Sequence, residues 1–131
     1  QVLFCPNGDV QETGASNFIL IKGNEIITKP LTDEFLHGVT RDSVLTVAKD
    51  LGYTVSERNF TVDELKAAVE EGAEAILTGT AAVISPVTSF VIDGKEIEVK
   101  SQERGYALRK ALTDIQYGLA EDKHGWLVEV C

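Results

Sequence analysis

The chain has 131 residues, 44% of them hydrophobic, which is enough to build one hydrophobic core without disulfides or a structural metal. Its formal net charge of −9 disfavours nucleic acid and anionic membranes as partners, because such binding depends on clustered Lys and Arg. No apolar run approaches the roughly 20 residues that a membrane span requires. We therefore expect a single domain over residues 1–131 that binds neither nucleic acid nor membrane.

The start of the chain and its thiols suggest where the protein works. The chain begins at Gln1 and shows no charged segment followed by an apolar one, the pattern of a signal peptide. We interpret this start as a cut through a longer protein. Cys5, Cys131, His37 and His124 lack metal-ligand spacing, so we expect free thiols in the cytoplasm, structural or exposed histidines, and no metal site.

The first part of the chain is predicted to form short strands joined by tight turns. Asn-Gly and Gly-Asn pairs supply the positive φ that hairpin turns need. The expected strands are 2–4, 18–21 and 25–28, with turns at 6–9 and 23–24.

Two helices are predicted in the middle of the chain. Apolar residues at helical spacing indicate a helix from about Thr40 to Gly52. A short strand near Val55 follows. Thr61 and Glu64 have the spacing of a capping box, which predicts a helix that continues through Glu71.

The last third is predicted to contain three strand regions and one more helix. The expected elements are strands at 75–77 and 83–92, a hairpin back through 97–99, a helix over 105–117, and a terminal strand or tail at 126–130. Strands and about three helices alternate without a fixed repeat. The sequence therefore favours a mixed α/β (α+β) fold.

Three stretches are candidates for ligand binding, judged from their residues alone. Gly38-Val39-Thr40-Arg41 leads into a helix whose first N–H groups can hold a phosphate; Thr40 as a plain helix cap is the alternative. In Gly79-Thr80-Ala81-Ala82, small residues let backbone N–H groups approach a ligand; a strand bend is the alternative. Glu12 precedes a turn-prone stretch, where an isolated glutamate would normally be exposed.

In their order and approximate spacing, these stretches resemble the fold-type-IV enzymes that use pyridoxal 5′-phosphate (PLP). The similarity runs nearly from end to end and corresponds to the C-terminal portion of branched-chain amino-acid aminotransferases. Thr-Asp-Ile-Gln-Tyr-Gly at 113–118 points to that group specifically. The other matching segments are 12–18, 36–41, 55–58, 79–81 and 85–87.

The resemblance implies a set of cofactor-binding residues. Glu12 would pair with the pyridine nitrogen of PLP, where a carboxylate raises the pKa of that nitrogen and keeps the ring able to accept electrons. Leu36 would pack on the ring. The backbone amides of Val39 and Thr40, together with one hydroxyl, would hold the phosphate, and Thr80 would add a second hydroxyl.

The resemblance also implies a reaction and its partners. The amides of Thr80 and Ala81 would bind the substrate carboxylate, and the amino group of leucine, isoleucine or valine would pass to 2-oxoglutarate. The lysine that holds PLP in this family, and the smaller N-terminal domain, have no counterpart in residues 1–131. We therefore expect the chain to be inactive alone and the longer protein to be a homodimer.

Two alternatives remain at this point. One is another fold-type-IV enzyme, a D-amino-acid aminotransferase or an aminodeoxychorismate lyase, although the 113–118 run argues against it. The other is a non-catalytic domain that binds a phosphorylated ligand or a partner chain.

Overall fold

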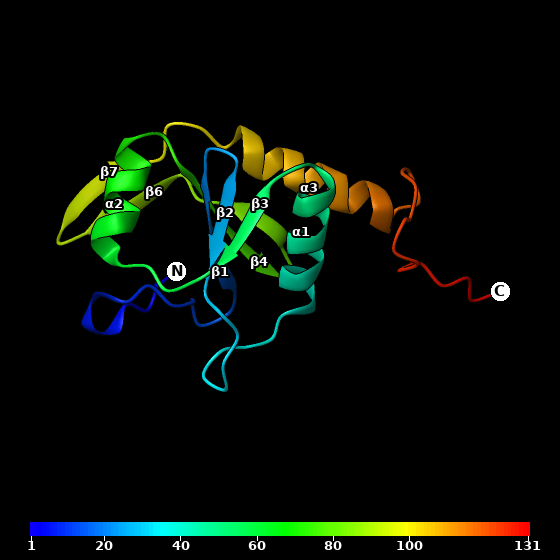
Figure 1. Cartoon of the computed structure of the whole chain (residues 1–131), viewed down its shortest axis with the longest axis horizontal. Helices are drawn as coiled ribbons and strands as arrows, with labels where there is room; N and C mark the ends of the chain where they lie inside the picture. The colour runs from blue at the N-terminus through cyan, green and yellow to red at the C-terminus, as the bar shows by residue number, and fades with distance from the viewer.

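A five-stranded sheet with the order β3-β2-β1-β4-β5 lies at the centre of the protein (Figure 1). The computed structural model describes residues 1–131. Strands β2 and β3 are parallel, and every other neighbouring pair is antiparallel. The bounds are β1 Asn17–Lys22, β2 Glu25–Thr28, β3 Thr54–Glu57, β4 Glu74–Gly79 and β5 Val83–Pro86.

Helices cover both faces of this sheet. On one face, α1 (Val39–Asp50) and α3 (Glu103–Gln116) pack against side chains such as Ile19 and Ile76. On the other face, α2 (Val62–Glu70) and a separate hairpin, β6 (Ser89–Ile92) and β7 (Lys95–Glu98), pack near Phe18 and Leu20. Neighbouring residues of a strand point to opposite faces of the sheet, and both faces are covered. The apolar run of β1 is therefore buried throughout.

Strand β1 and strand β2 form the hairpin that the sequence predicts. Residues 18–21 and 25–28 lie within these strands, and Gly23 in the turn has a φ of +59°. Glycine lacks a Cβ and adopts this conformation at little cost, which explains its presence in the turn. The predicted helices and the mixed α/β fold are confirmed as well, with α1 and α2 close to the expected bounds and α3 beginning at Glu103.

Helix α3 is fixed to the sheet by two unusual contacts. Glu74, the first residue of β4, is only 2% exposed, and its carboxylate accepts hydrogen bonds from the N–H groups of Arg104 and Gly105. A Cβ on Gly105 would lie 2.9 Å from Cγ2 of Ile76 and 3.2 Å from Cγ of Pro86. The glycine therefore lets the helix approach the sheet closely.

Two predictions about strands are wrong. Residues 2–4 do not form a strand, because the segment pairs with the chain only at a bridge between Leu3 and Thr13. The expected strand 83–92 is divided between two sheets, because β5 ends at Pro86 and pairs with β4, whereas β6 begins at Ser89 and pairs with β7. The segment 126–130 is a tail, one of the two forms expected for it.

The capping box is half confirmed. Oγ1 of Thr61 accepts from the N–H of Glu64 at 3.2 Å and caps α2. The Glu64 carboxylate pairs with Arg58 instead of reaching back to the cap. No helix, including the short 3-10 helix at Pro6–Gly8, combines the length and the apolar character that crossing a membrane would require.

Candidate functional site

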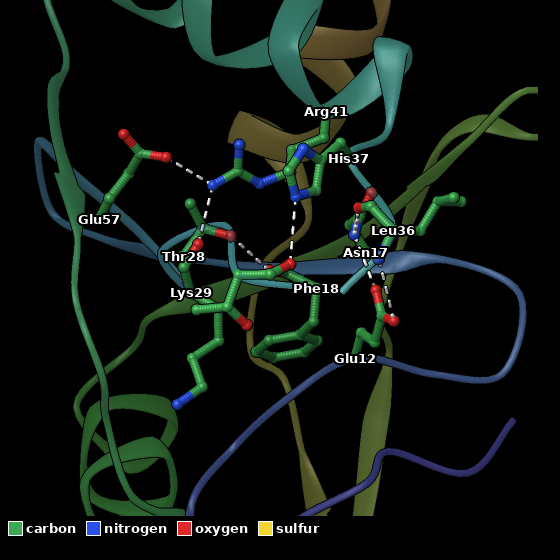
Figure 2. Close-up of polar contacts among 10 residues, drawn as sticks. Glu12, Asn17, Phe18, Thr28, Lys29, Leu36, His37, Arg41 and Glu57 are labelled. Carbon is green, nitrogen blue, oxygen red and sulfur yellow. Dashed lines mark hydrogen bonds and ion pairs between the residues drawn. The ribbon is translucent and has the colours of Figure 1, made fainter. Parts of the chain in front are cut away.

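Glu12 lies in the loop before β1, with its half-buried side chain held from two sides. Its Oε2 accepts a hydrogen bond from Nδ2 of Asn17 at 2.8 Å, and its Oε1 accepts a longer one from the N–H of Leu36 at 3.4 Å (Figure 2). The expectation of a freely solvated glutamate therefore does not hold. The carboxylate is oriented by its neighbours.

The start of α1 offers open hydrogen-bond donors. Gly38 is the N-cap, and it has no side chain that could occupy the first N–H groups. The N–H groups of Val39, Thr40 and Arg41 find no acceptor within the chain, and the Thr40 hydroxyl makes no hydrogen bond. Thr40 is inside the helix, so its interpretation as a plain cap is wrong. The positive end of the helix dipole adds to the attraction for an anion.

The stretch 79–82 forms the turn between β4 and β5. Gly79 ends β4, and Val83 begins β5 with a φ of +60°, a conformation that β-branched residues rarely adopt. Thr80 and Ala81 are exposed at the tip of the turn. A Cβ on Gly79 would lie 3.5 Å from the carbonyl oxygen of Ala15, so this turn packs against the loop that carries Glu12.

The sheet topology explains why the three segments meet. Since β1 is antiparallel to β2 and β4, the beginning of β1 lies beside the ends of both neighbours. Asn17 at the start of β1 is opposite Thr78 near the end of β4. Its Nδ2 also donates to the carbonyl of Leu36, in the loop between β2 and α1, at 2.9 Å. Glu12, the start of α1 and the Gly79 turn are therefore joined at one end of the sheet.

Two apolar side chains of the site are uncovered. Leu36 is 71% exposed and Val39 is 82% exposed. Singly exposed apolar residues are ordinary, but these two flank the open N–H groups at the start of α1. They leave an apolar surface next to the open N–H groups of this helix end.

The charged residues near the site are engaged in structural contacts. Arg41 is buried, and it donates to Oε1 of Glu57 at 2.7 Å and to the carbonyl of Lys29 at 2.8 Å (Figure 2). Nζ of Lys29, the single buried lysine, contacts both carboxylate oxygens of Asp9 and Oδ1 of Asn59. All three ammonium protons of Lys29 are thus used, so this lysine is not a free nucleophile.

Two features of the site were not assigned a role from the sequence. Asn17 was part of a motif, but its place between Glu12 and Leu36 depends on the fold. Oγ1 of Thr78 is buried and has no hydrogen-bond partner. The sequence does not reveal that this hydroxyl lacks a partner, because a single threonine in an apolar strand is an ordinary pattern.

An open pocket lies elsewhere on the protein. It has a volume of about 820 Å³ and lies between the first residues, α2 and β6, on the α2 side of the sheet. Its lining includes Phe18, Leu77 and Phe90 but none of the residues of the candidate site. This pocket is therefore separate from the place where Glu12, the start of α1 and the Gly79 turn meet.

Comparisons with known proteins agree with the resemblance. The family described as "Amino-transferase class IV" matches residues 1–90. A protein of Streptomyces coelicolor named "Probable branched-chain-amino-acid aminotransferase" is 44% identical over 123 residues, covering 90% of this chain and 34% of that protein. The chain thus spans about a third of the length of this curated relative.

Solved structures show the same relationship. The branched-chain amino acid aminotransferase from Escherichia coli superposes with a TM-score of 0.79 at 33% identity, covering 94% of this chain and 40% of that one. The corresponding enzyme from Thermobaculum terrenum, solved in its PLP form, gives a TM-score of 0.79 at 32% identity, covering 96% of this chain and 40% of that one. The fold is therefore that of these enzymes, over the part of them that the chain covers.

Proposed function

This chain belongs to the class IV aminotransferase family, and we propose that it is the cofactor-holding part of a branched-chain amino-acid aminotransferase. The observation that carries the proposal is the convergence of Glu12, the start of α1 and the Gly79 turn at one end of the sheet. The 44% identity to a named branched-chain aminotransferase supports this substrate class.

The residues at this end of the sheet fit PLP. Its phosphate requires several N–H or O–H donors, and the start of α1 has three open N–H groups and the free hydroxyl of Thr40. Its pyridine nitrogen requires an acidic partner, and the Glu12 carboxylate is held in place for one. Its ring requires an apolar surface, which Leu36 offers. Each part of the cofactor thus finds matching chemistry.

When bound, PLP would supply an electron sink for the carbanion formed at the α-carbon of the amino acid. The residues of this chain would orient it. Glu12 would hold a proton at the ring nitrogen, while Val39, Thr40 and Thr80 would bind the phosphate. The amides of Thr80 and Ala81, exposed at the turn, would bind the substrate carboxylate.

The rest of the enzyme would lie outside residues 1–131. We propose that the lysine that binds PLP belongs to a preceding segment, because the chain spans about a third of its curated relative and the lysine that lines the small pocket beside Glu12, Lys29, is fully paired. The chain alone would then be inactive. The longer protein would transfer the amino group of leucine, isoleucine or valine to 2-oxoglutarate as a cytoplasmic homodimer.

Substrate assays on the full-length protein test this function. We expect leucine with 2-oxoglutarate to be converted and D-alanine to be left unchanged. Preferential use of D-alanine would identify a D-amino-acid aminotransferase instead. A protein that binds phosphate compounds but never acquires the absorbance of bound PLP would be a non-catalytic domain.

A further inference from the structure

Asn17, the first residue of β1, links two segments that are distant in the sequence. The residue is only 7% exposed. Its Nδ2 donates to Oε2 of Glu12 at 2.8 Å and to the carbonyl oxygen of Leu36 at 2.9 Å (Figure 2). An amide nitrogen carries two protons, so both are used, and one side chain ties the acid to the loop before α1.

The oxygen of the same side-chain amide explains why the N-cap of α1 is a glycine. A Cβ on Gly38 would lie 2.2 Å from Oδ1 of Asn17, which is far inside any permitted contact. Gly38 has a φ of −64° and a ψ of 126°, a conformation open to every residue type. The glycine is therefore required by the position of Asn17 and not by the backbone.

A third contact closes the arrangement. The N–H of Leu36 donates to Oε1 of Glu12 at 3.4 Å, on the opposite side of the carboxylate from Asn17. Glu12, Asn17 and the loop 36–38 thus form a closed set of contacts anchored on the sheet. A shift of any one member would move the other two.

We propose that Asn17 is a positioning residue that sets the distance between the Glu12 carboxylate and the start of α1. This inference rests on the proposed function, in which these two elements hold opposite ends of one cofactor. The pyridine ring of PLP is rigid and its phosphate is attached by a short arm, so the ring nitrogen and the phosphate can be bound together only within a narrow range of separations. With Asn17 in place, that separation is set before the cofactor arrives, and binding need not order the loop.

An Asn17→Asp variant tests the contact with Glu12 by placing a second carboxylate against it. The N–H donor that holds Glu12 is lost and two like charges repel each other, so the acid and the loop before α1 should move apart. We expect the PLP dissociation constant of the full-length variant to increase about tenfold or more over that of the wild type.

Two further proteins complete this experiment. In Glu12→Gln/Asn17→Asp the donor and the acceptor of the hydrogen bond exchange sides, so Asn17→Asp should weaken PLP binding far less in the Glu12→Gln background than in the wild type. Thr28→Val is the matched control, because it removes a buried hydrogen bond to the carbonyl of Phe18 without touching Glu12. It should leave the PLP dissociation constant unchanged. An equal loss of PLP affinity from Asn17→Asp in both backgrounds, in folded proteins, would overturn the inference.

The contact with Gly38 gives an independent test that does not depend on the folding of the aspartate variant. Gly38→Ala should displace the Asn17 side chain and weaken PLP binding about as strongly as Asn17→Ala does. In the double variant Asn17→Ala/Gly38→Ala the new Cβ has room, so the second substitution should add little further loss. Additive losses in the PLP dissociation constant would contradict the role of Asn17.

The stability of the apoprotein separates positioning from simple structural support. Asn17→Asp and Thr28→Val each disturb buried hydrogen bonds, so both should lower the melting temperature. Only Asn17→Asp should also weaken PLP binding. If the wild-type full-length protein fails to bind PLP, the proposed function falls together with the inference; if it binds PLP but Asn17→Asp costs equal affinity with and without Glu12→Gln, only the inference falls.

Discussion

At the candidate site, neutral groups are free to bind a ligand, whereas charged side chains are used in contacts within the chain. At the candidate site the open groups are neutral: the amides of Val39 and Thr40 and the hydroxyls of Thr40 and Thr80. The neighbouring cations, Arg41 and Lys29, are paired within the chain. An anion would therefore be held by a helix end and by hydroxyl groups, without a lysine or arginine from this chain.

Glu12→Gln tests the partner of the ring nitrogen. A glutamine keeps the size of the side chain but removes its charge and replaces one of its two acceptor oxygens by a donor. In the full-length protein we expect PLP to remain bound while transamination slows strongly, because the ring nitrogen loses its ionic partner. Single-turnover kinetics and the absorbance of the bound cofactor report the two effects separately. Unchanged turnover would remove Glu12 from the site.

Thr80→Val tests the second hydroxyl expected on the phosphate. Loss of one charge-assisted hydrogen bond should weaken PLP binding by about 1–3 kcal/mol, measured as the dissociation constant of the full-length protein. Thr46→Val is a suitable control, since Thr46 is in the same chain but donates its hydroxyl proton to the carbonyl of Asp42 on the exposed side of α1. Equal affinities in all three proteins would favour Gly79–Ala82 as a simple strand bend.

At the scale of elements, the attachment of α3 depends on one buried acid. Glu74 accepts from the N–H of Gly105 at 2.9 Å, from that of Arg104 at 3.2 Å and from the hydroxyl of Ser101 at 3.1 Å. These contacts satisfy the first N–H groups of the helix, which otherwise lack partners. Glu74 thereby connects the beginning of β4 to the beginning of α3.

Glu74→Gln should therefore destabilise the fold. The amide nitrogen would replace one acceptor oxygen and face a donor, and the favourable charge at the helix start would be lost. We expect a decrease of about 1–3 kcal/mol in the free energy of unfolding, measured by urea denaturation of the full-length protein. Glu71→Gln, at an exposed position without side-chain hydrogen bonds, should have almost no effect. Equal effects of the two substitutions would argue against the capping role.

The stability that the Arg58–Glu64 pair gives to the start of α2 should depend on pH. The hydrogen bond from Arg58 holds the pKa of the Glu64 carboxyl below its ordinary value of 4.5. A carboxyl whose pKa is lowered by folding stabilises the folded state above its unfolded-state pKa, and this contribution is lost as the pH falls below that range. Both side chains are partly exposed, so the contribution is small.

Unfolding of the wild type and Glu64→Gln at a series of pH values measures this contribution. The difference in the free energy of unfolding should be constant near neutral pH and should disappear as the solution becomes more acidic than about pH 4. A difference that grows on acidification would mean that the Arg58–Glu64 pair does not favour the folded state.

The elements also show what the sequence could and could not predict. Turn residues fixed the β1–β2 hairpin, and Thr61 marked the start of α2, because both signals are local. The run 83–92 looked like one strand because apolar periodicity does not tell which sheet a strand joins. Its break after Pro86 depends on pairing with β4 on one side and with β7 on the other.

At the scale of the whole molecule, the candidate site was only partly predictable. Glu12, the start of α1 and the Gly79 turn were identified from local chemistry and from a family resemblance. Their proximity follows from β1 lying between β2 and β4, which no spacing in the sequence reveals. The position of Asn17 depends on its contact with the carbonyl of Leu36. A glycine is needed at position 38 because the Asn17 side chain lies against it.

A structure of the full-length protein with PLP tests the common location of these elements most directly. We predict the Glu12 carboxylate within about 2.7–3.2 Å of the ring nitrogen, with the phosphate on the N–H groups of Val39 and Thr40 and on the hydroxyl of Thr80. PLP bound elsewhere, or with its ring nitrogen remote from Glu12, would contradict the account.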